Sequence, residues 1–297
     1  MQKLIIEAAL NEQASKAVNP HVPYDPEEIA RDALAAGAAG AAIVHFHARD
    51  PGSGALLHPG TEVYRDAMRR IRAADPELIL YPTYGFSDTP QERFSHLEAL
   101  AADPEIRLDF ATIDPGAVNY AALDPHTGEL GDEFVLSVSH AEVRHFLELC
   151  RRHRMQHSVV VRELGHVRHA LAYRSQGRLD APIFFKIVLS DHHAFGIAPS
   201  ARALQIFTEL AIPADVPHHW MTYVEGPRHT ELCMLAVAMG GHVRTGLGDN
   251  PLLDGEVLTN AQQVERVVEM ARLRGRDVAT PAEVRKMLAT PGAGGRG

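Results

Sequence analysis

Short apolar runs rich in β-branched residues alternate with amphipathic stretches along the chain, and this alternation constrains the fold more than any other feature. We expect eight strands, each followed by a helical segment. The strands are predicted at 3–10, 41–47, 78–83, 108–113, 158–163, 182–189, 219–224 and 242–247. Strand–helix alternation is typical of a parallel sheet covered by helices, and eight such units in roughly 275 residues fit a closed barrel.

Residue patterns at the starts of the helical stretches agree with this alternation. Asp25 and Glu28 form a capping-box pattern, and Thr280 and Glu283 form another before the last helix. We expect helices at about 26–36, 61–74, 139–153, 200–210, 228–239, 260–274 and 281–288. Two more are expected, one that begins near residue 89 and one that follows the fifth strand and ends near residue 176. The segment 114–138 is expected to be irregular.

The predicted fold class is α/β: a single (β/α)8 TIM barrel over residues 1–290 with an extra C-terminal helix, then a flexible tail over 291–297. A length of 297 residues also allows two medium domains, but no linker or shift in composition marks a boundary. An open doubly wound sheet is a further alternative. Such a sheet usually carries a glycine-rich turn after its first strand, and the sequence AALNEQAS contains no glycine.

Composition excludes several classes of partner. The formal net charge is −9 and the basic residues do not cluster, so we expect no nucleic-acid partner. No apolar run approaches the roughly 20 residues of a spanning helix, and the first residues lack a signal-peptide layout, so we expect no membrane partner. The two cysteines, Cys150 and Cys233, cannot form a disulfide framework, which is typical of a reducing compartment. We therefore expect a cytoplasmic protein that acts on small molecules.

Of 18 histidines, His45 and His47 are the two best placed for chemistry. They end the second predicted strand in the sequence VHFH, so both side chains face one side of the strand and Phe46 faces the other. In a barrel of this kind, the active site lies at the carboxyl ends of the strands. Two imidazoles facing the barrel mouth suit zinc or a similar divalent ion; the alternative is hydrogen bonding within a polar layer of the barrel.

A metal site needs at least one further ligand. Polar side chains near other strand ends are the candidates: Glu7, Glu12, Asp114, Glu163, Asp191, His192, His193 and Asp249. Glu7 is unusual because it lies inside the apolar run IIEAAL, where an unpaired buried charge costs several kcal/mol. It either reaches the metal from the neighbouring strand or forms a buried salt bridge to an inward-facing Arg or Lys.

The last predicted strand carries a second unusual charge. Arg244 interrupts its apolar run, and a permanently charged guanidinium requires an anion nearby. A substrate carboxylate, a structural pair with Asp249, or both together would satisfy that requirement. Gly246 and Gly248 either allow the backbone to approach a ligand closely or form an ordinary turn.

Five segments together resemble the family of β-keto acid cleavage enzymes. They lie between residues 5 and 251 and read AALNE, NPHVPYDPEEIARDALAAGAA, IVHFHARDP, ATIDPGAVNY and GGHVRTGLGDNP. The resemblance implies a (β/α)8 barrel, a divalent metal that is usually zinc, and a homodimer or homotetramer. It also implies a retro-Claisen condensation, in which a β-keto acid and acetyl-CoA give a new acyl-CoA and acetoacetate.

Carried onto this sequence, the resemblance assigns roles to individual residues. His45 and His47 match the two metal-binding histidines of the family. Arg244 and Asp249 match an arginine and an aspartate that cooperate in substrate activation and proton transfer. Glu12 matches a substrate-facing glutamate with a one-residue gap, and we expect a catalytic role for it.

The expected substrate-binding residues are Thr83, Asn119 and Asp114. Pro82 and Ala117 replace two small polar residues of the family pattern beside them. Thr83 and Asn119 are the neutral polar groups that remain, and they are expected to hydrogen-bond the substrate.

Other positions depart further from the family pattern. Gly248 stands where the family has a glutamate as third metal ligand. We hypothesise that Glu7 supplies this carboxylate, with Glu12 as the alternative donor. Ser158 and Val160 stand in place of an acidic pair, and SDHHAFG stands in place of a glycine-rich loop. We therefore expect a substrate different from the amino acid-derived one.

These residues predict a mechanism and leave alternatives open. Asp249, oriented by Arg244, is expected to generate the carbon nucleophile while the metal polarises the ketone. The alternative is a metal-dependent hydrolase or aldolase of a small carboxylate on the same barrel, with His192 or His193 as a further ligand. A non-catalytic metal- or carboxylate-binding protein is a third possibility. Dependence on acetyl-CoA separates the first reading from the others.

Overall fold

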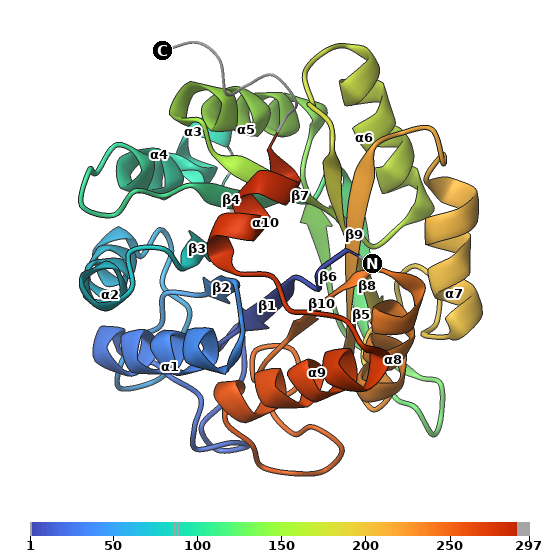
Figure 1. Cartoon of the computed structure of the whole chain (residues 1–297), viewed down its shortest axis with the longest axis horizontal. Helices are drawn as coiled ribbons and strands as arrows, with labels where there is room; N and C mark the ends of the chain where they lie inside the picture. The colour runs from blue at the N-terminus through green and yellow to red at the C-terminus, as the bar shows by residue number, and fades with distance from the viewer. Residues whose placement is uncertain (1, 86, 88, 290–297) are drawn as a thin grey trace.

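The computed structural model describes residues 2–85, 87 and 89–289, and it shows eight parallel strands surrounded by helices (Figure 1). The hydrogen-bonded order is β3-β2-β1-β10-β9-β8-β7-β4. The rings of Tyr81 on β3 and Phe110 on β4 lie 5.2 Å apart, so the two outer strands of this order meet and the barrel is nearly closed. The strands are β1 (Ile6–Ala9), β2 (Ile43–Phe46), β3 (Ile79–Pro82), β4 (Phe110–Ile113), β7 (Gln156–Val161), β8 (Ile183–Ser190), β9 (His218–Glu225) and β10 (His242–Thr245).

This architecture confirms the predicted TIM barrel, and each strand lies within two or three residues of its predicted position. The predicted tail over 291–297 lies outside the described residues. Within the part of the chain that the structure describes, no helix has the length and apolar character needed to cross a membrane.

The helices form the outer layer of the barrel. The capping boxes at Asp25 and Thr280 are present, because each side chain accepts a hydrogen bond from the backbone three residues later. The helix expected near residue 89 is broken at Phe94, and the one expected at 200–210 continues as a π-helical turn. The helices are α1 (Pro26–Ala39), α2 (Thr61–Ala74), α3 (Pro90–Arg93), α4 (Ser95–Ala101), α5 (His140–His153), α6 (Leu164–Ser175), α7 (Ala201–Gln205), η1 (Ile206–Ala211), α8 (His229–Met239), α9 (Asn260–Arg274) and α10 (Pro281–Leu288).

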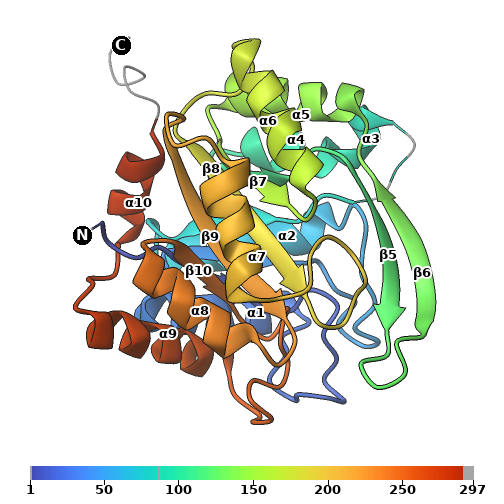
Figure 2. The ribbon, with the colours of Figure 1, turned by 90° about the vertical axis from the view of Figure 1, so that its right-hand side faces the viewer.

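The segment expected to be irregular contains an antiparallel hairpin, and that expectation was wrong. Strands β5 (Ala117–Leu123) and β6 (Leu130–Ser137) pair with each other and form a separate two-stranded sheet. Figure 2 shows the hairpin on the side of the molecule opposite α10. Val118 and Tyr120 face inward and pack with Leu136 against side chains of the barrel, so the hairpin forms one wall above the strand ends.

Helix α10 covers the amino end of the barrel. Gln156 at the start of β7 donates to the carbonyl of Arg285 at 2.8 Å, and His219 of β9 contacts the carbonyl of Met287 at 3.0 Å. Arg285 also pairs with Asp109, just before β4. Because this end is covered, a small molecule must enter from the carboxyl ends of the strands.

The turn after β10 predicts a test of the barrel's closure. Gly246 has φ of +143°, and a Cβ there would lie 2.1 Å from the carbonyl oxygen of Ala9 at the end of β1. We expect Gly246→Ala to lower the free energy of unfolding by about 2–4 kcal/mol, because rigid backbone must move and a disfavoured φ is retained. Urea denaturation measures this change.

Gly255 supplies the matched control. Its φ is +81°, but no atom lies within 4 Å of a Cβ at that position. Gly255→Ala should therefore cost only about 1 kcal/mol, from backbone strain alone. Equal losses in the two variants would show that the contact with Ala9 is unimportant.

Candidate active site

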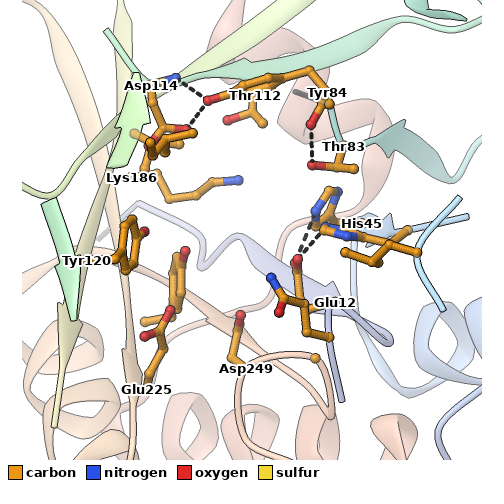
Figure 3. A pocket seen from close by; sticks show the side chains of 18 of the residues that line it. Glu12, His45, Thr83, Tyr84, Thr112, Asp114, Tyr120, Lys186, Glu225 and Asp249 are labelled. Atoms are coloured by element: carbon orange, nitrogen blue, oxygen red, sulfur yellow. Dashed lines mark hydrogen bonds and ion pairs between the residues drawn. The ribbon is translucent and has the colours of Figure 1, made fainter. Parts of the chain in front are cut away.

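A cavity of about 430 Å³ opens at the carboxyl ends of the strands, which is a volume suited to a small substrate. Its walls come from the loop after β1, the ends of β2, β3, β4 and β7–β10, and the β5–β6 hairpin. In Figure 3, Glu12 and His45 lie on one side of the cavity, and Tyr120 and Glu225 lie across from them. The cavity therefore lies at the end of the barrel where the sequence predicts the site.

Three side chains in this cavity form a group that could hold a metal ion. Glu12, His45 and His47 each offer one ligand atom, and these atoms all lie within 4.8 Å of one another. Nε2 of His45 lies 3.0 Å from one carboxylate oxygen of Glu12, and Nε2 of His47 contacts the other oxygen. The alternation of β2 points both imidazoles into the cavity and buries Phe46 against α2, as predicted.

The donor atoms of this group fit a divalent cation. Nδ1 of His45 lies 3.1 Å from the carbonyl oxygen of Tyr81, so this nitrogen carries the hydrogen that is donated. Burial lowers the pKa of His45 to about 4, so the ring is neutral and its Nε2 carries a lone pair. That lone pair faces a carboxylate oxygen of Glu12, and a divalent cation bound by both atoms would satisfy these two acceptors. A neutral His oriented by a backbone carbonyl is a typical ligand of zinc.

The loop that carries Glu12 is held in place by two buried polar side chains. Arg49 donates to the carbonyls of Asn11, Glu12 and Ala14 at 2.7–2.9 Å. The side chain of Asn11 bridges the loop to His47, because it accepts from the His47 N–H at 2.8 Å and donates to the His47 carbonyl at 3.1 Å. Glu12 itself has φ of +28°, a conformation that a non-glycine residue keeps only when its surroundings enforce it.

Gly248 leaves the space that Glu12 occupies. A Cβ at Gly248 would lie 2.5 Å from Cγ of Glu12, and the Gly248 N–H donates to the Ala9 carbonyl at 2.9 Å. A side chain at position 248 and the observed position of Glu12 therefore exclude each other. The carboxylate nearest to the two imidazoles therefore comes from the loop after β1, and position 248 after β10 has no side chain.

Glu7 is the residue for which the hypothesis needs correction, because the structure does not bring it into the metal group. In the parallel register Glu7 pairs with Ile43 and Ala9 pairs with His45, so Glu7 lies two residues deeper in the barrel than His45. Its Oε1 accepts from Nζ of Lys186 at 2.8 Å and from Oη of Tyr81 at 2.5 Å. The buried salt bridge, the second possibility for Glu7, is what the structure shows.

Burial and neighbouring charges have opposite effects on the pKa values of Glu7 and Lys186. Burial raises the pKa of Glu7, but Lys186 and Arg244 outweigh it and hold that pKa below its ordinary value. Burial lowers the pKa of Lys186 to about 8, with Glu7 opposing the change. Lys186 was missed from the sequence, although a lysine inside the apolar run IFFKIVLS is as unusual as a glutamate inside IIEAAL.

Arg244 joins the carboxylates of the site. Its Nε and Nη2 donate to the two oxygens of Asp249 at 2.8 and 2.6 Å, which is a bidentate pair. The same Nη2 contacts Glu12, and Nη1 lies 3.3 Å from Glu7. Burial raises the pKa of Asp249 to about 6, while Arg244 acts in the opposite direction. A carboxylate with a pKa near 6 is suited to accept a proton at neutral pH.

The expected substrate-binding residues have different outcomes. Thr83 and Asp114 line the cavity, and Asp114 accepts from Tyr84 and pairs with Arg162. Asn119 is exposed and lies outside the cavity, because the alternation of β5 turns it away while Val118 and Tyr120 face inward. The expectation for Asn119, which came from the family resemblance, was therefore wrong.

Further charged groups meet in the cavity beyond those expected. His193 Nδ1 pairs with Oε2 of Glu225 at 3.0 Å, and both residues line the cavity. His192 lines it as well but is exposed, and it is not part of the metal group found among residues 2–85, 87 and 89–289. Arg162 and Glu225 were missed from the sequence, although Arg162 directly follows β7 and Glu225 ends β9, which are positions where site residues are expected.

Comparison with known proteins agrees with this site. A family model described as beta-keto acid cleavage enzyme matches residues 3–289. The chain is 33% identical, over 97% of its length and 98% of the relative, to the 3-keto-5-aminohexanoate cleavage enzyme of Fusobacterium nucleatum. It is 29% identical, over 90% of both chains, to the 3-dehydrocarnitine:acetyl-CoA trimethylamine transferase of Rhizobium meliloti.

A solved structure supports the fold. The apo structure of ObcA matches 91% of this chain with a TM-score of 0.68 and 20% identity, and this chain covers 65% of the ObcA chain. At that identity the likeness concerns the barrel alone. The match of the family model over nearly the whole chain, together with a relative at 33% identity, shows that this protein belongs to the family of beta-keto acid cleavage enzymes.

Proposed function

We propose that this protein cleaves a β-keto acid by a metal-dependent retro-Claisen condensation with acetyl-CoA, and that the products are acetoacetate and a new acyl-CoA. The observation that supports the proposal most directly is the Arg244–Asp249 pair beside Glu12, His45 and His47 in one cavity. Family membership supports the reaction class, and the relative from Rhizobium meliloti is named as a transferase that uses acetyl-CoA.

Glu12, His45 and His47 would hold the metal. We propose that the metal is zinc, because two imidazoles and one carboxylate are ligands typical of zinc. A divalent ion held there supplies a Lewis acid for the ketone and carboxylate oxygens of the β-keto acid. We place the protein in the cytoplasm, which is consistent with two free, buried cysteines. Assembly as a homodimer or homotetramer stays a prediction.

Asp249 would act as the base. Its carboxylate takes a proton from C2 of the β-keto acid, and the C2 carbanion forms a bond to the acetyl carbon of acetyl-CoA as the thiolate leaves. The thiolate then attacks C3, the C2–C3 bond breaks, and C2 takes a proton back to give acetoacetate. Arg244 fixes the orientation of Asp249 through two hydrogen bonds and balances the negative charge that develops.

Dependence on a thioester tests the reaction class. With zinc-loaded protein and a panel of β-keto acids, we expect acetoacetate and a new acyl-CoA to form in equal amounts when acetyl-CoA is present. Treatment with a chelator should abolish this activity, and added zinc should restore it. Cleavage of the keto acid without acetyl-CoA would identify a hydrolase or aldolase instead.

Replacement of Glu12 and of Glu7 tests the metal ligands. We expect Glu12→Gln to weaken zinc binding by about 100-fold, because a charged ligand is lost, and Glu7→Gln to retain zinc. Competition with a chromophoric chelator measures both affinities. The double variant Glu12→Ala/Gly248→Glu should bind zinc more tightly than Glu12→Ala, since position 248 is then free to supply a carboxylate. Loss of zinc from Glu7→Gln alone would favour the original hypothesis for Glu7.

The pKa of Asp249 predicts a pH dependence. Because the deprotonated carboxylate is the base and its pKa is about 6, kcat/KM should be constant above pH 7 and should fall about tenfold per pH unit below 6. Asp249→Asn should lower kcat by roughly 10³-fold and remove this dependence. Steady-state rates between pH 5 and 8 measure it, and an unchanged profile in the variant would assign the titration to another group.

A further inference from the structure

The wall of the cavity opposite the metal group is mostly apolar. Tyr120 and Leu136 of the hairpin, Val160 of β7 and Tyr223 of β9 belong to one cluster of buried side chains, and all four line the cavity. Figure 3 shows Tyr120 on the side of the cavity opposite His45. A substrate held at the metal group through its carboxylate and ketone would extend the remainder of its chain toward this wall.

The charged side chains on this side of the cavity contact partners within the protein. Arg162 pairs with Asp114, and His193 pairs with Glu225 at 3.0 Å. Asp114 also accepts a hydrogen bond from Tyr84. A charged substrate group would have to compete with one of these internal partners, because a charge removed from water without a counter-charge is strongly disfavoured.

The inner part of the site has a different charge balance. Two cations, Lys186 and Arg244, contact three carboxylates, those of Glu7, Glu12 and Asp249. One negative charge is left over, and a divalent ion converts it into one positive charge. The inner site thus complements a single carboxylate, while the outer charged groups already contact partners within the protein.

We propose that the substrate is a β-keto monocarboxylate whose remaining chain is uncharged and largely apolar, with Val160 as the residue that favours this neutrality. This inference rests on the proposed function and makes it more specific. Val160 is the strand neighbour of Lys186, lines the cavity with it and belongs to the apolar wall, so the charged group and the apolar wall adjoin at this position. An acid at position 160 would place a negative charge where the substrate chain lies.

Three six-carbon β-keto acids test the proposal on the zinc-loaded protein. 3-Oxohexanoate has a neutral chain, 3-oxoadipate adds a carboxylate, and 3-keto-5-aminohexanoate adds an ammonium group. We expect kcat/KM with acetyl-CoA to be roughly 30-fold or more higher for 3-oxohexanoate than for either charged acid. Equal or higher values for a charged acid would overturn the inference.

Binding without acetyl-CoA separates this inference from the proposed function. Isothermal titration gives the Kd of each acid when no transfer takes place, and the neutral acid should bind roughly 30-fold more tightly. If none of the acids is cleaved, the proposed reaction fails while the order of Kd values still decides the inference. A charged acid that binds as tightly as 3-oxohexanoate would overturn it.

A pair of matched variants tests the role of Val160. Val160→Glu should raise the ratio of kcat/KM for 3-keto-5-aminohexanoate over 3-oxohexanoate by about 10-fold or more, because an ammonium group then has a partner. Val160→Gln introduces a side chain of nearly the same size as glutamate but without the charge. It should leave this ratio within about threefold of the wild-type value. Equal responses of the two variants would show that charge at position 160 does not select the substrate. Thermal unfolding checks that both variants are folded, and the wild-type series stands if they are not.

Discussion

The buried guanidinium of Arg244 is the interaction on which the rest of the site depends. It contacts Glu7 deep in the barrel, Glu12 in the loop after β1 and Asp249 in the loop after β10, so one cation joins three carboxylates from separate segments. Without it, these carboxylates would repel one another in a region where charge is costly to bury. The network therefore fixes the geometry of the site more than it stabilises the fold. Arg244 orients Asp249, while burial raises the pKa of that carboxyl group to about 6 against the opposing effect of Arg244.

In the metal group, the loop after β1 supplies a carboxylate and the loop after β10 supplies the space for it. Gly248 removes a side chain after β10, and Glu12 fills the space from the opposite side. This exchange requires a rigid first loop, which Arg49 and Asn11 supply through hydrogen bonds to backbone atoms. The strained conformation of Glu12 is held by these bonds, as expected where a functional side chain must stay in one place.

Sequence patterns predicted most strands and helices well, but they did not predict how far each side chain lies from the cavity. The eight strands, the capped helices and the paired histidines follow from periodicity and from local hydrogen bonding, which act over a few residues. Val118 and Tyr120 alternate with exposed residues, but the β5–β6 hairpin was missed because a short strand with one buried and one exposed face gives only a weak hydrophobic pattern. The family resemblance placed Asn119 in the site, whereas the observed alternation turns it toward solvent.

The sequence by itself determined the barrel, the strand ends at which the site lies, and the histidine pair on one face of β2. Tertiary structure decided which carboxylate joins them. Both Glu7 and Glu12 were candidates, and the register between β1 and β2 sets Glu7 two residues too deep to reach the imidazoles. The same packing gave Glu7 a lysine partner from β8, 179 residues away in sequence. Register and long-range pairing depend on how separate strands meet, so no local pattern could specify them.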